Sequence, residues 1–113
     1  MHIGIVGLGK MGNNMRARLR AAGVEVTGYD PNADVTDVKS LAEMVAALVA
    51  PRVVWVMVPS GAITDQVIRD VSDVLEPGDL IIDGGNSRFT DDAVHAKFLE
   101  AKGIKFIDVG VSG

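Results

Sequence analysis

The sequence predicts a three-layer α/β/α fold built on a doubly wound parallel sheet. Short runs rich in β-branched residues alternate with segments of helical periodicity along the whole chain, which is the pattern of parallel strands joined by crossover helices. The strand candidates are apolar throughout, as in strands buried on both faces. The 113 residues are enough for one domain with a core but not for two. Right-handed crossovers then place ligand sites at the carboxyl ends of the strands, where the strand order reverses.

The first thirty residues predict a strand, a helix and a second strand in succession. An apolar run at 2–6 precedes a helical stripe, and a β-branched run at 24–30 follows it. Gly23 is expected to end the helix as its C′ residue. The apolar stripe of the helix consists of Met11, Met15, Leu19 and Ala22. Three arginines lie off this stripe and are expected to be solvated charges, namely Arg16, Arg18 and Arg20.

A glycine-rich corner joins the first strand to the first helix. Gly7, Gly9 and Gly12 fill the pattern G-x-G-x-x-G. In this pattern the first glycine allows a tight turn, the second lets a pyrophosphate approach the backbone, and the third lets the helix pack on the strand. The N–H groups at the helix start then face the phosphates. Asp30 ends the next strand 18 residues after Gly12 (30 − 12), close to the spacing of about 20 expected for an acid that binds ribose hydroxyls.

These features predict a Rossmann-type domain that binds a dinucleotide. The alternative is a glycine-rich turn in a flavodoxin-like domain without a dinucleotide. In a Rossmann strand order the first and fourth strands flank the ligand crevice. The loops facing each other there are 7–12 and 59–61.

The middle of the chain predicts two further elements. Polar residues follow the second strand, and a short extended piece is expected at 35–38. A capping box at 40–43 begins a helix that runs to Leu48. The continuous β-branched run 52–58 predicts a central strand, in which Trp55 serves core packing.

The second half repeats the alternation of helix and strand. The next helix is expected to bury Ile63, Val67, Val71 and Val74. Pro77 and Gly78 occupy the central positions of a type II turn before a strand at 80–82. A further helix is expected to begin at the N-cap Thr90, with Asp91 and Asp92 in its first turn, to bury Val94, Phe98 and Ala101, to expose His95 and to end at Gly103. The last strand candidate is 104–109.

Composition excludes several classes of function. The formal net charge of −4 and the pI near 5.0 argue against a nucleic-acid or anionic-membrane surface. There is no cysteine, so neither a disulfide nor a thiolate site is possible. The chain enters its first strand without a basic leader, and no apolar run approaches the roughly 18 residues of a membrane span. A cytoplasmic location without a metal centre is therefore expected.

Two later loops carry candidate chemistry. Asn86 follows two glycines in the block 83–87, and its amide can both donate and accept, as orienting a nicotinamide carboxamide or a substrate hydroxyl requires. Ser112 and Gly113 offer a hydroxyl and bare N–H groups for a carboxylate or phosphate. Both blocks are also good turn sequences, and spacing alone does not separate the two interpretations.

Four blocks of the sequence, occurring in order, resemble one enzyme family. They are Gly7-Leu8-Gly9-Lys10-Met11-Gly12-Asn13-Asn14-Met15, Val58-Pro59-Ser60-Gly61, Ile82-Asp83-Gly84-Gly85-Asn86-Ser87 and Asp108-Val109-Gly110-Val111-Ser112-Gly113. Together they resemble the N-terminal coenzyme domain of decarboxylating 6-phosphogluconate dehydrogenase, over the whole chain. Related β-hydroxyacid dehydrogenases usually carry Asp-x-Ser-Thr in the third block and Ala-Pro-Val-Ser-Gly in the fourth, so the differences here favour the phosphogluconate family.

The resemblance implies oxidation of 6-phosphogluconate at C3 by hydride transfer, followed by decarboxylation to ribulose 5-phosphate. This reaction would belong to the pentose phosphate pathway and gluconate use. Asn86 would lie where nicotinamide and substrate meet, and Ser112 and Gly113 would bind substrate. The implied cofactor contacts are Gly7, Leu8, Gly9, Lys10, Met11, Gly12, Asp30, Val58, Pro59, Ser60 and Asn86.

Two departures from the family pattern bear on the cofactor. NADP-using members usually place Asn-Arg-Thr after the second strand, whereas this chain has Tyr29-Asp30-Pro31. A carboxylate accepts hydrogen bonds from ribose hydroxyls and repels a 2′-phosphate, so NAD is expected in preference to NADP, as in the shorter bacterial branch. The segment between Asp30 and Ser40 is also shorter than in most relatives and lacks their helix.

The family's general-base lysine, His-Asn pair and acidic proton donor match no residue of this chain. They belong to a helical domain that would follow Gly113, which in this family also builds the dimer. Residues 1–113 are therefore expected to form one dinucleotide-binding domain that does not turn over alone and is a monomer or a weak self-associate. The alternatives are a 3-hydroxyisobutyrate-type dehydrogenase, or a stand-alone or engineered dinucleotide-binding module without chemistry.

Overall fold

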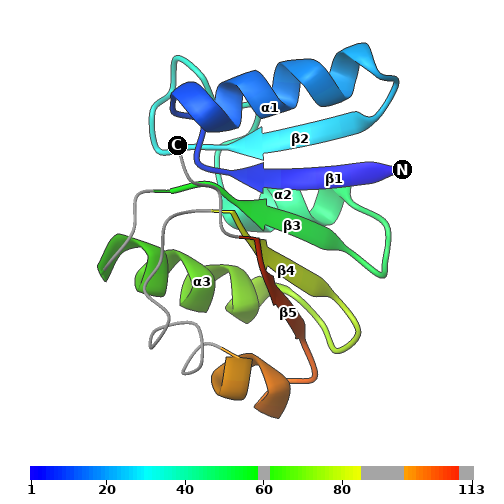
Figure 1. The fold of residues 1–113 in the computed structure, drawn as a ribbon, viewed down its shortest axis with the longest axis vertical. Coiled ribbons are helices and arrows are strands. Elements are labelled where there is room, and N and C mark those ends of the chain that lie inside the picture. The colour runs from blue at the N-terminus through cyan, green and yellow to red at the C-terminus, as the bar shows by residue number, and fades with distance from the viewer. Residues whose placement is uncertain (59–61, 85–95, 110–113) are drawn as a thin grey trace.

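In a computed structural model, the chain forms a parallel sheet with helices on both faces (Figure 1). The structure describes residues 1–58, 62–84 and 96–109. The strands are β1 (His2–Val6), β2 (Glu25–Tyr29), β3 (Val53–Val56), β4 (Leu80–Asp83) and β5 (Lys105–Asp108). The helices are α1 (Lys10–Ala21), α2 (Leu41–Ala47) and α3 (Ala62–Val74), and residues 96–101 are also helical. The predicted α/β/α class with a parallel sheet is confirmed.

The order of the strands is β2-β1-β3-β4-β5, and every neighbouring pair is parallel. The chain steps outward from β1 to β2 and then crosses back over β1 to β3. Because crossovers between parallel strands are right-handed, this reversal puts α1 on one face of the sheet and the later helices on the other. The loops that follow β1 and β3 therefore diverge, and their divergence opens the switch point. Figure 1 shows α1 beside β1 and β2, and α3 beside β3 and β4.

An apolar cluster packs on each face of the sheet. On the α1 face, Ile5, Leu8 and Val26 are buried, and Met15 and Leu19 of α1 pack against them. The larger cluster lies on the other face and joins three strands to α2, α3 and the helical residues 96–101. Its buried members are Val6, Met44, Val45, Leu48, Val54, Val56, Ile68, Val71, Leu75, Ile81, Leu99 and Ile104. Each fully buried aliphatic side chain of this set stabilises the fold by about 1.5–3 kcal/mol.

Local signals in the sequence fix several ends of elements as predicted. Ser40 Oγ accepts from the Glu43 N–H at 3.1 Å, and the Glu43 carboxylate accepts at 2.8 Å from the N–H of Lys39, the residue before the N-cap. Gly23 has φ +88°, and the bonds around it close a Schellman motif at the end of α1. Gly78 has φ +96° in a turn closed by the Asp79 N–H on the Glu76 carbonyl at 3.1 Å.

The extended piece expected at 35–38 is not a strand. It runs along the outer edge of β2, and only part of its bonding is backbone to backbone. The Asp37 N–H donates to the Gly28 carbonyl at 2.9 Å, while the Gly28 N–H donates to the Asp37 carboxylate and the Asp30 N–H to the Thr36 hydroxyl. Side chains of the segment occupy positions where a ladder would use backbone groups, so no regular pairing develops.

The predicted face of α3 is confirmed at Val67, Val71 and Val74, which lie in or pack against the larger cluster. The prediction is wrong at Ile63. Ile63 is 57% exposed, whereas Thr64, Ile68, Val71 and Leu75 are buried. The spacing of these four residues follows the helical period of 3.6 residues. A polar residue at the first of the four positions hid the stripe from a count of apolar residues.

Two other helix faces also differ from the prediction. Met11 is 45% exposed and Ala22 is exposed, so α1 packs chiefly through Met15 and Leu19. In the helical residues 96–101, Leu99 is buried and Ala101 is exposed. Residues 90–95 of the predicted helix, including Val94 and His95, lie outside the described residues.

Trp55 packs against the apolar cluster on the α1 face, as predicted. Its side chain fixes the identity of the residue after β4, because a Cβ on Gly84 would collide with the indole Nε1. Within the part of the chain that the structure describes, this buried indole N–H has no hydrogen-bond partner. Gly84 is therefore required for core packing.

Candidate functional site

The glycine corner lies at the carboxyl end of β1 against the residues that follow β3. Gly7 has φ +95°, and a Cβ there would lie 2.8 Å from Val58 Cγ1 and 2.9 Å from the Met57 carbonyl oxygen. A Cβ on Gly12 would collide with the carbonyl oxygen of Gly7. Any side chain at either position would push α1 or β3 away from β1, so the tight corner requires both glycines.

Gly9 differs from the other two glycines. Among the described residues, and apart from its neighbours in the chain, no atom lies within 4 Å of a Cβ built on it. It is exposed and is the N-cap of α1, without a side-chain cap bond, and the first turn of the helix carries no acid. The N–H groups of the helix start carry the positive end of the helix dipole. An anion can approach this backbone, and a side chain at Gly9 would block it. Lys10 begins the helix and is exposed.

Asp30, at the end of β2, is tied to this corner. Its Oδ2 accepts from the Leu8 N–H at 2.8 Å, and its Oδ1 accepts from the Asn32 N–H at 2.8 Å. The Gly7 N–H donates to the Tyr29 carbonyl at 2.9 Å and closes the same junction. An ionised carboxylate offers about four lone-pair positions, so both oxygens keep acceptor capacity for a further donor such as a hydroxyl.

The end of β3 lies against the glycine corner. The Met57 N–H donates to the Val6 carbonyl at 2.7 Å, and Val58 lies against Gly7. Half-buried Val58 thus stands where the sequence predicted a cofactor contact. The structure brings together Gly7, Leu8, Gly9, Gly12, Asp30 and Val58. The predicted site residues Pro59, Ser60, Asn86, Ser112 and Gly113 lie outside the described residues.

Sequence reasoning missed a charged cluster beside β2. Arg16 and Arg20 were expected to be solvated, but the Arg16 side chain is only 11% exposed and both guanidiniums pair with Asp37, at 3.2 and 2.8 Å. Burial opposes ionisation of Asp37, but the Gly28 N–H and the two guanidiniums outweigh it and hold the pKa of the Asp37 carboxyl below its ordinary value. The spacing of the two arginines, one turn apart on α1, is the signal that could have indicated a shared partner.

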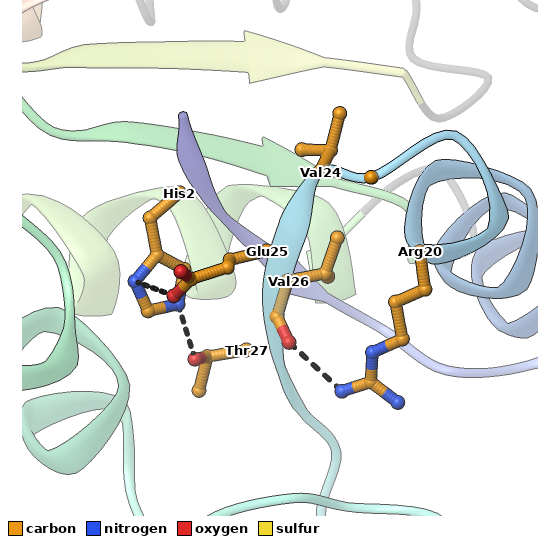
Figure 2. Close-up of a pocket in the computed structure, with 7 residues that line it drawn as sticks. His2, Arg20, Val24, Glu25, Val26 and Thr27 are labelled. Carbon is orange, nitrogen blue, oxygen red and sulfur yellow. Dashed lines mark hydrogen bonds and ion pairs between the residues drawn. The ribbon is translucent and has the colours of Figure 1, made fainter.

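A second hollow lies at the opposite end of the strands, near the amino ends of β1 and β2. Figure 2 shows that the polar groups lining it pair with one another. His2 Nε2 lies 2.7 Å from Thr27 Oγ1, His2 Nδ1 lies 3.7 Å from the Glu25 carboxylate, and Arg20 donates to the Val26 carbonyl at 2.8 Å. These contacts secure the edge of β2, and none of the predicted site residues lies in this hollow.

Within the described ranges, no group of three His, Asp or Glu side chains could hold a metal ion. A search of the same residues finds no helix long and apolar enough to cross a membrane. The described site offers backbone N–H groups at the start of α1, the exposed Lys10 side chain, the Asp30 carboxylate and the apolar side chain of Val58.

Three features define a nucleotide-binding domain of the doubly wound α/β class: a glycine corner that opens a helix, an acid after the neighbouring strand β2, and a reversal of strand order between β1 and β3. Residues 2–113 match the family model of the NAD-binding domain of 6-phosphogluconate dehydrogenase, and the chain belongs to this family.

Three dehydrogenases are among the known proteins similar to this chain. The NAD(+)-dependent, decarboxylating 6-phosphogluconate dehydrogenase of Bacillus subtilis is 36% identical over 98% of this chain and 26% of its own length. A 3-hydroxyisobutyrate dehydrogenase structure from Mycobacterium tuberculosis, with L-serine, has a TM-score of 0.87 and 33% identity, over 99% of this chain and 40% of its own. The Plasmodium falciparum 6-phosphogluconate dehydrogenase, studied with NADP+ and with 6-phosphogluconate, has a TM-score of 0.86 and 25% identity, over 94% of this chain and 26% of its own. The chain thus spans well under half the length of each.

Proposed function

We propose that this chain is the coenzyme-binding part of a decarboxylating 6-phosphogluconate dehydrogenase and that its cofactor is NAD. The family membership supports the first half of the proposal. The observation that carries the second is the carboxylate of Asp30, held at the glycine corner by the Leu8 N–H and free to accept hydroxyl donors. The domain would serve the cytoplasmic oxidation of 6-phosphogluconate to ribulose 5-phosphate.

The described residues fit the parts of a dinucleotide. The open backbone at Gly9, followed by Lys10 and Met11 at the helix start, suits the pyrophosphate. Asp30 suits the adenosine ribose, and Val58 with the residues after it suits the wall of the crevice. When bound, NAD accepts the hydride removed from C3 of the substrate. Asn86 would orient nicotinamide and substrate, and Ser112 and Gly113 would bind the substrate.

The charge of Asp30 decides between NAD and NADP in this proposal. A carboxylate beside the ribose repels a 2′-phosphate, and the two guanidiniums nearest to β2 are already paired with Asp37. The Bacillus subtilis relative is named as an NAD(+)-dependent enzyme, whereas the Plasmodium enzyme was studied with NADP+. Asp30 in this chain favours NAD over NADP.

Binding is tested by calorimetric titration of the pure chain with NAD and, separately, with NADP at moderate salt. We expect NAD to bind more tightly and Asp30→Ala to weaken NAD by about 10- to 100-fold, because a hydrogen bond to a charged group contributes roughly 1.5–3 kcal/mol. Asp34→Ala, which removes an exposed acid of the same segment, is the matched control and should change little. Preference for NADP would overturn the cofactor assignment, and Lys10→Ala would then show whether that lysine binds the 2′-phosphate.

Oxidation and decarboxylation require a general base and a proton donor, and no residue of this chain matches those of the family. We infer that the 113 residues bind dinucleotide without oxidising 6-phosphogluconate, and that activity returns when the helical part of a family member is joined to them. Turnover by the pure chain would contradict this inference. Sedimentation of the same sample tests the expectation of a monomer or weak self-associate.

A second candidate function is oxidation of a 3-hydroxy acid without a phosphate. The similarity to the Mycobacterium tuberculosis structure favours it. Substrate choice by the joined protein separates the two, since only 6-phosphogluconate carries a phosphate. A third reading, a stand-alone binding module, predicts dinucleotide binding in every case and no activity after joining.

A further inference from the structure

The segment 35–38, which follows Asp30 in the chain, forms a side-chain hydrogen bond to the backbone of Asp30. The Asp30 N–H donates to Thr36 Oγ1 at 3.0 Å, and Thr36 Oγ1 donates to the Val38 carbonyl at 2.7 Å. A hydroxyl has one proton to donate. Because the Val38 carbonyl takes that proton, a lone pair of Thr36 Oγ1 is directed at the Asp30 N–H.

Asp37 fixes the segment 35–38 to the edge of β2 by two hydrogen bonds to one residue of the strand, Gly28. Its backbone N–H donates to the Gly28 carbonyl at 2.9 Å, and its Oδ2 accepts from the Gly28 N–H at 2.8 Å. Both backbone groups of Gly28 are thereby bonded to Asp37. Gly28 lies two residues before Asp30, and a Cβ on it would lie 2.9 Å from the Leu8 side chain, so Leu8 packs directly on the strand that ends in Asp30.

The same carboxylate connects the segment to the helix of the glycine corner. Arg16 and Arg20, both on α1, pair with Asp37 at 3.2 and 2.8 Å. Arg16 also donates to the Val35 carbonyl at 2.9 Å, and Arg20 to the Val26 carbonyl at 2.8 Å, the contact that Figure 2 shows between α1 and β2. Helix α1, strand β2 and the segment 35–38 are therefore joined at Asp37.

We propose that Thr36 and Asp37 are positioning residues for Asp30, which set how its carboxylate meets the adenosine ribose. The proposal rests on the proposed function, because it assigns these residues to the ribose end of the dinucleotide site. In a doubly wound sheet the outer edge of β2 is where a further strand could pair. Here the side chains of Thr36 and Asp37, in an irregular segment, accept hydrogen bonds at this edge, and Thr36 accepts from the backbone of Asp30.

The test compares NAD with the NAD analogue that lacks the adenosine 2′-hydroxyl, titrated into the wild-type chain and its variants. We expect wild type to bind NAD at least tenfold more tightly than the analogue. Asp37→Ala and Thr36→Val should bring this ratio close to one by weakening NAD and leaving the analogue almost unchanged. Thr36→Ser, which keeps the hydroxyl, should restore most of the ratio. Asp34→Ala, with the same loss of charge on the same segment, should leave the ratio at the wild-type value.

A merely structural role gives a different result, because loosening the fold weakens both ligands by the same factor. Equal weakening, or a ratio unchanged in both Asp37→Ala and Thr36→Val, would overturn the proposal. In the Asp30→Ala background, Asp37→Ala should have no further effect on the ratio, and an effect there would equally overturn it. Thermal unfolding of each variant shows whether it folds. If Asp37→Ala does not fold, the comparison of Thr36→Val with Thr36→Ser still decides the test.

The two proposals fail in different ways. If wild type binds neither NAD nor NADP, the proposed function fails. If wild type binds NAD with the expected dependence on Asp30 but the ratio ignores Thr36 and Asp37, only the positioning role fails.

Discussion

The backbone N–H of Leu8 donates to the Asp30 carboxylate at 2.8 Å, so the end of β2 holds the corner that follows β1. The Asn32 N–H takes the second oxygen at the same distance. With about half of its acceptor capacity used, Asp30 can fix the corner and still accept hydroxyl donors. The structure of the glycine corner and the recognition of a ribose hydroxyl therefore both depend on the Asp30 side chain.

Removal of this carboxylate should expose the Leu8 amide. In Asp30→Ala we expect hydrogen exchange at Leu8 to accelerate by about 10- to 100-fold, the equivalent of roughly 1.5–3 kcal/mol for a bond to a charged acceptor. Amide exchange followed by NMR measures this directly. Asp34→Ala is the control and should leave the Leu8 rate unchanged. A Leu8 amide equally protected in Asp30→Ala would show that the bond does not hold the corner.

The glycines of the corner should separate stability from binding. Gly12→Ala forces a methyl group against the Gly7 carbonyl, so we expect a loss of about 1–3 kcal/mol of unfolding free energy. Gly9→Ala meets no neighbouring atom, so its stability should remain within about 0.5 kcal/mol of wild type. The same methyl group at Gly9 occupies the approach to the helix start, and NAD affinity should fall at least tenfold.

Thermal unfolding and calorimetry of the two variants test this contrast. Gly9→Ala with normal NAD affinity would place the pyrophosphate elsewhere. Gly12→Ala with wild-type stability would mean that α1 moves away from β1 at little cost.

The sequence predicted the architecture because the architecture depends on short local patterns. The run 2–6, the glycine corner and the capping box at Ser40 each need only neighbouring residues to specify them, and each is found as predicted. The ionic contacts of Asp37 could not be predicted in this way. They join residues 17 and 21 positions apart (37 − 20 and 37 − 16), and their geometry exists only after α1 has packed beside β2.

The helix faces show a second limit. In α3 the buried positions include Thr64, which is 1% exposed, while Ile63 beside it is 57% exposed. A pattern of apolar residues selects the wrong one of two adjacent side chains when the buried position is polar. Helix α3 packs against α2 and β3, and a count of residues along the helix alone does not include these neighbours.

A buried ion pair at the amino ends of β3 and β4 should make stability depend on acid. Asp79 is 1% exposed and accepts from the Arg52 N–H at 2.7 Å, the Glu76 N–H at 2.8 Å and the Arg52 guanidinium at 3.2 Å. Burial opposes ionisation, but these donors outweigh it and lower the pKa of the Asp79 carboxyl below its ordinary value of 3.8. Its stabilisation is therefore present above about pH 3.8 and is lost as the pH falls through the native pKa.

We expect Asp79→Ala to lower the unfolding free energy by about 3–5 kcal/mol at pH 7. It removes the acceptor of two backbone N–H groups, and it leaves the largely buried Arg52 guanidinium with the exposed Glu76 carboxylate, 3.7 Å away, in place of Asp79. Denaturant unfolding at a series of pH values measures the difference from wild type, which should stay constant from pH 7 to 5 and shrink below pH 3.8. Asp73→Ala removes an exposed partner of Lys102 and should cost less than about 1 kcal/mol. A difference that grows on acidification would refute the assignment of the low pKa to Asp79.

The contact between Trp55 and Gly84 should be sensitive to one added methyl group. A Cβ on Gly84 would collide with the indole Nε1 and lie 2.9 Å from Cδ1, while the Gly84 N–H holds the strand end on the Val56 carbonyl at 2.9 Å. Gly84→Ala must therefore displace the indole or open the end of β4, at a cost of about 1–3 kcal/mol. Because Trp55 is the single tryptophan of the chain, its fluorescence should also shift. Trp55→Phe removes the closest of these contacts and leaves the end of the flexible Met57 side chain, 2.5 Å from the added Cβ, to move aside. The double variant should therefore be more stable than the sum of the two single losses predicts. Strictly additive losses would show that the indole and the glycine do not constrain each other.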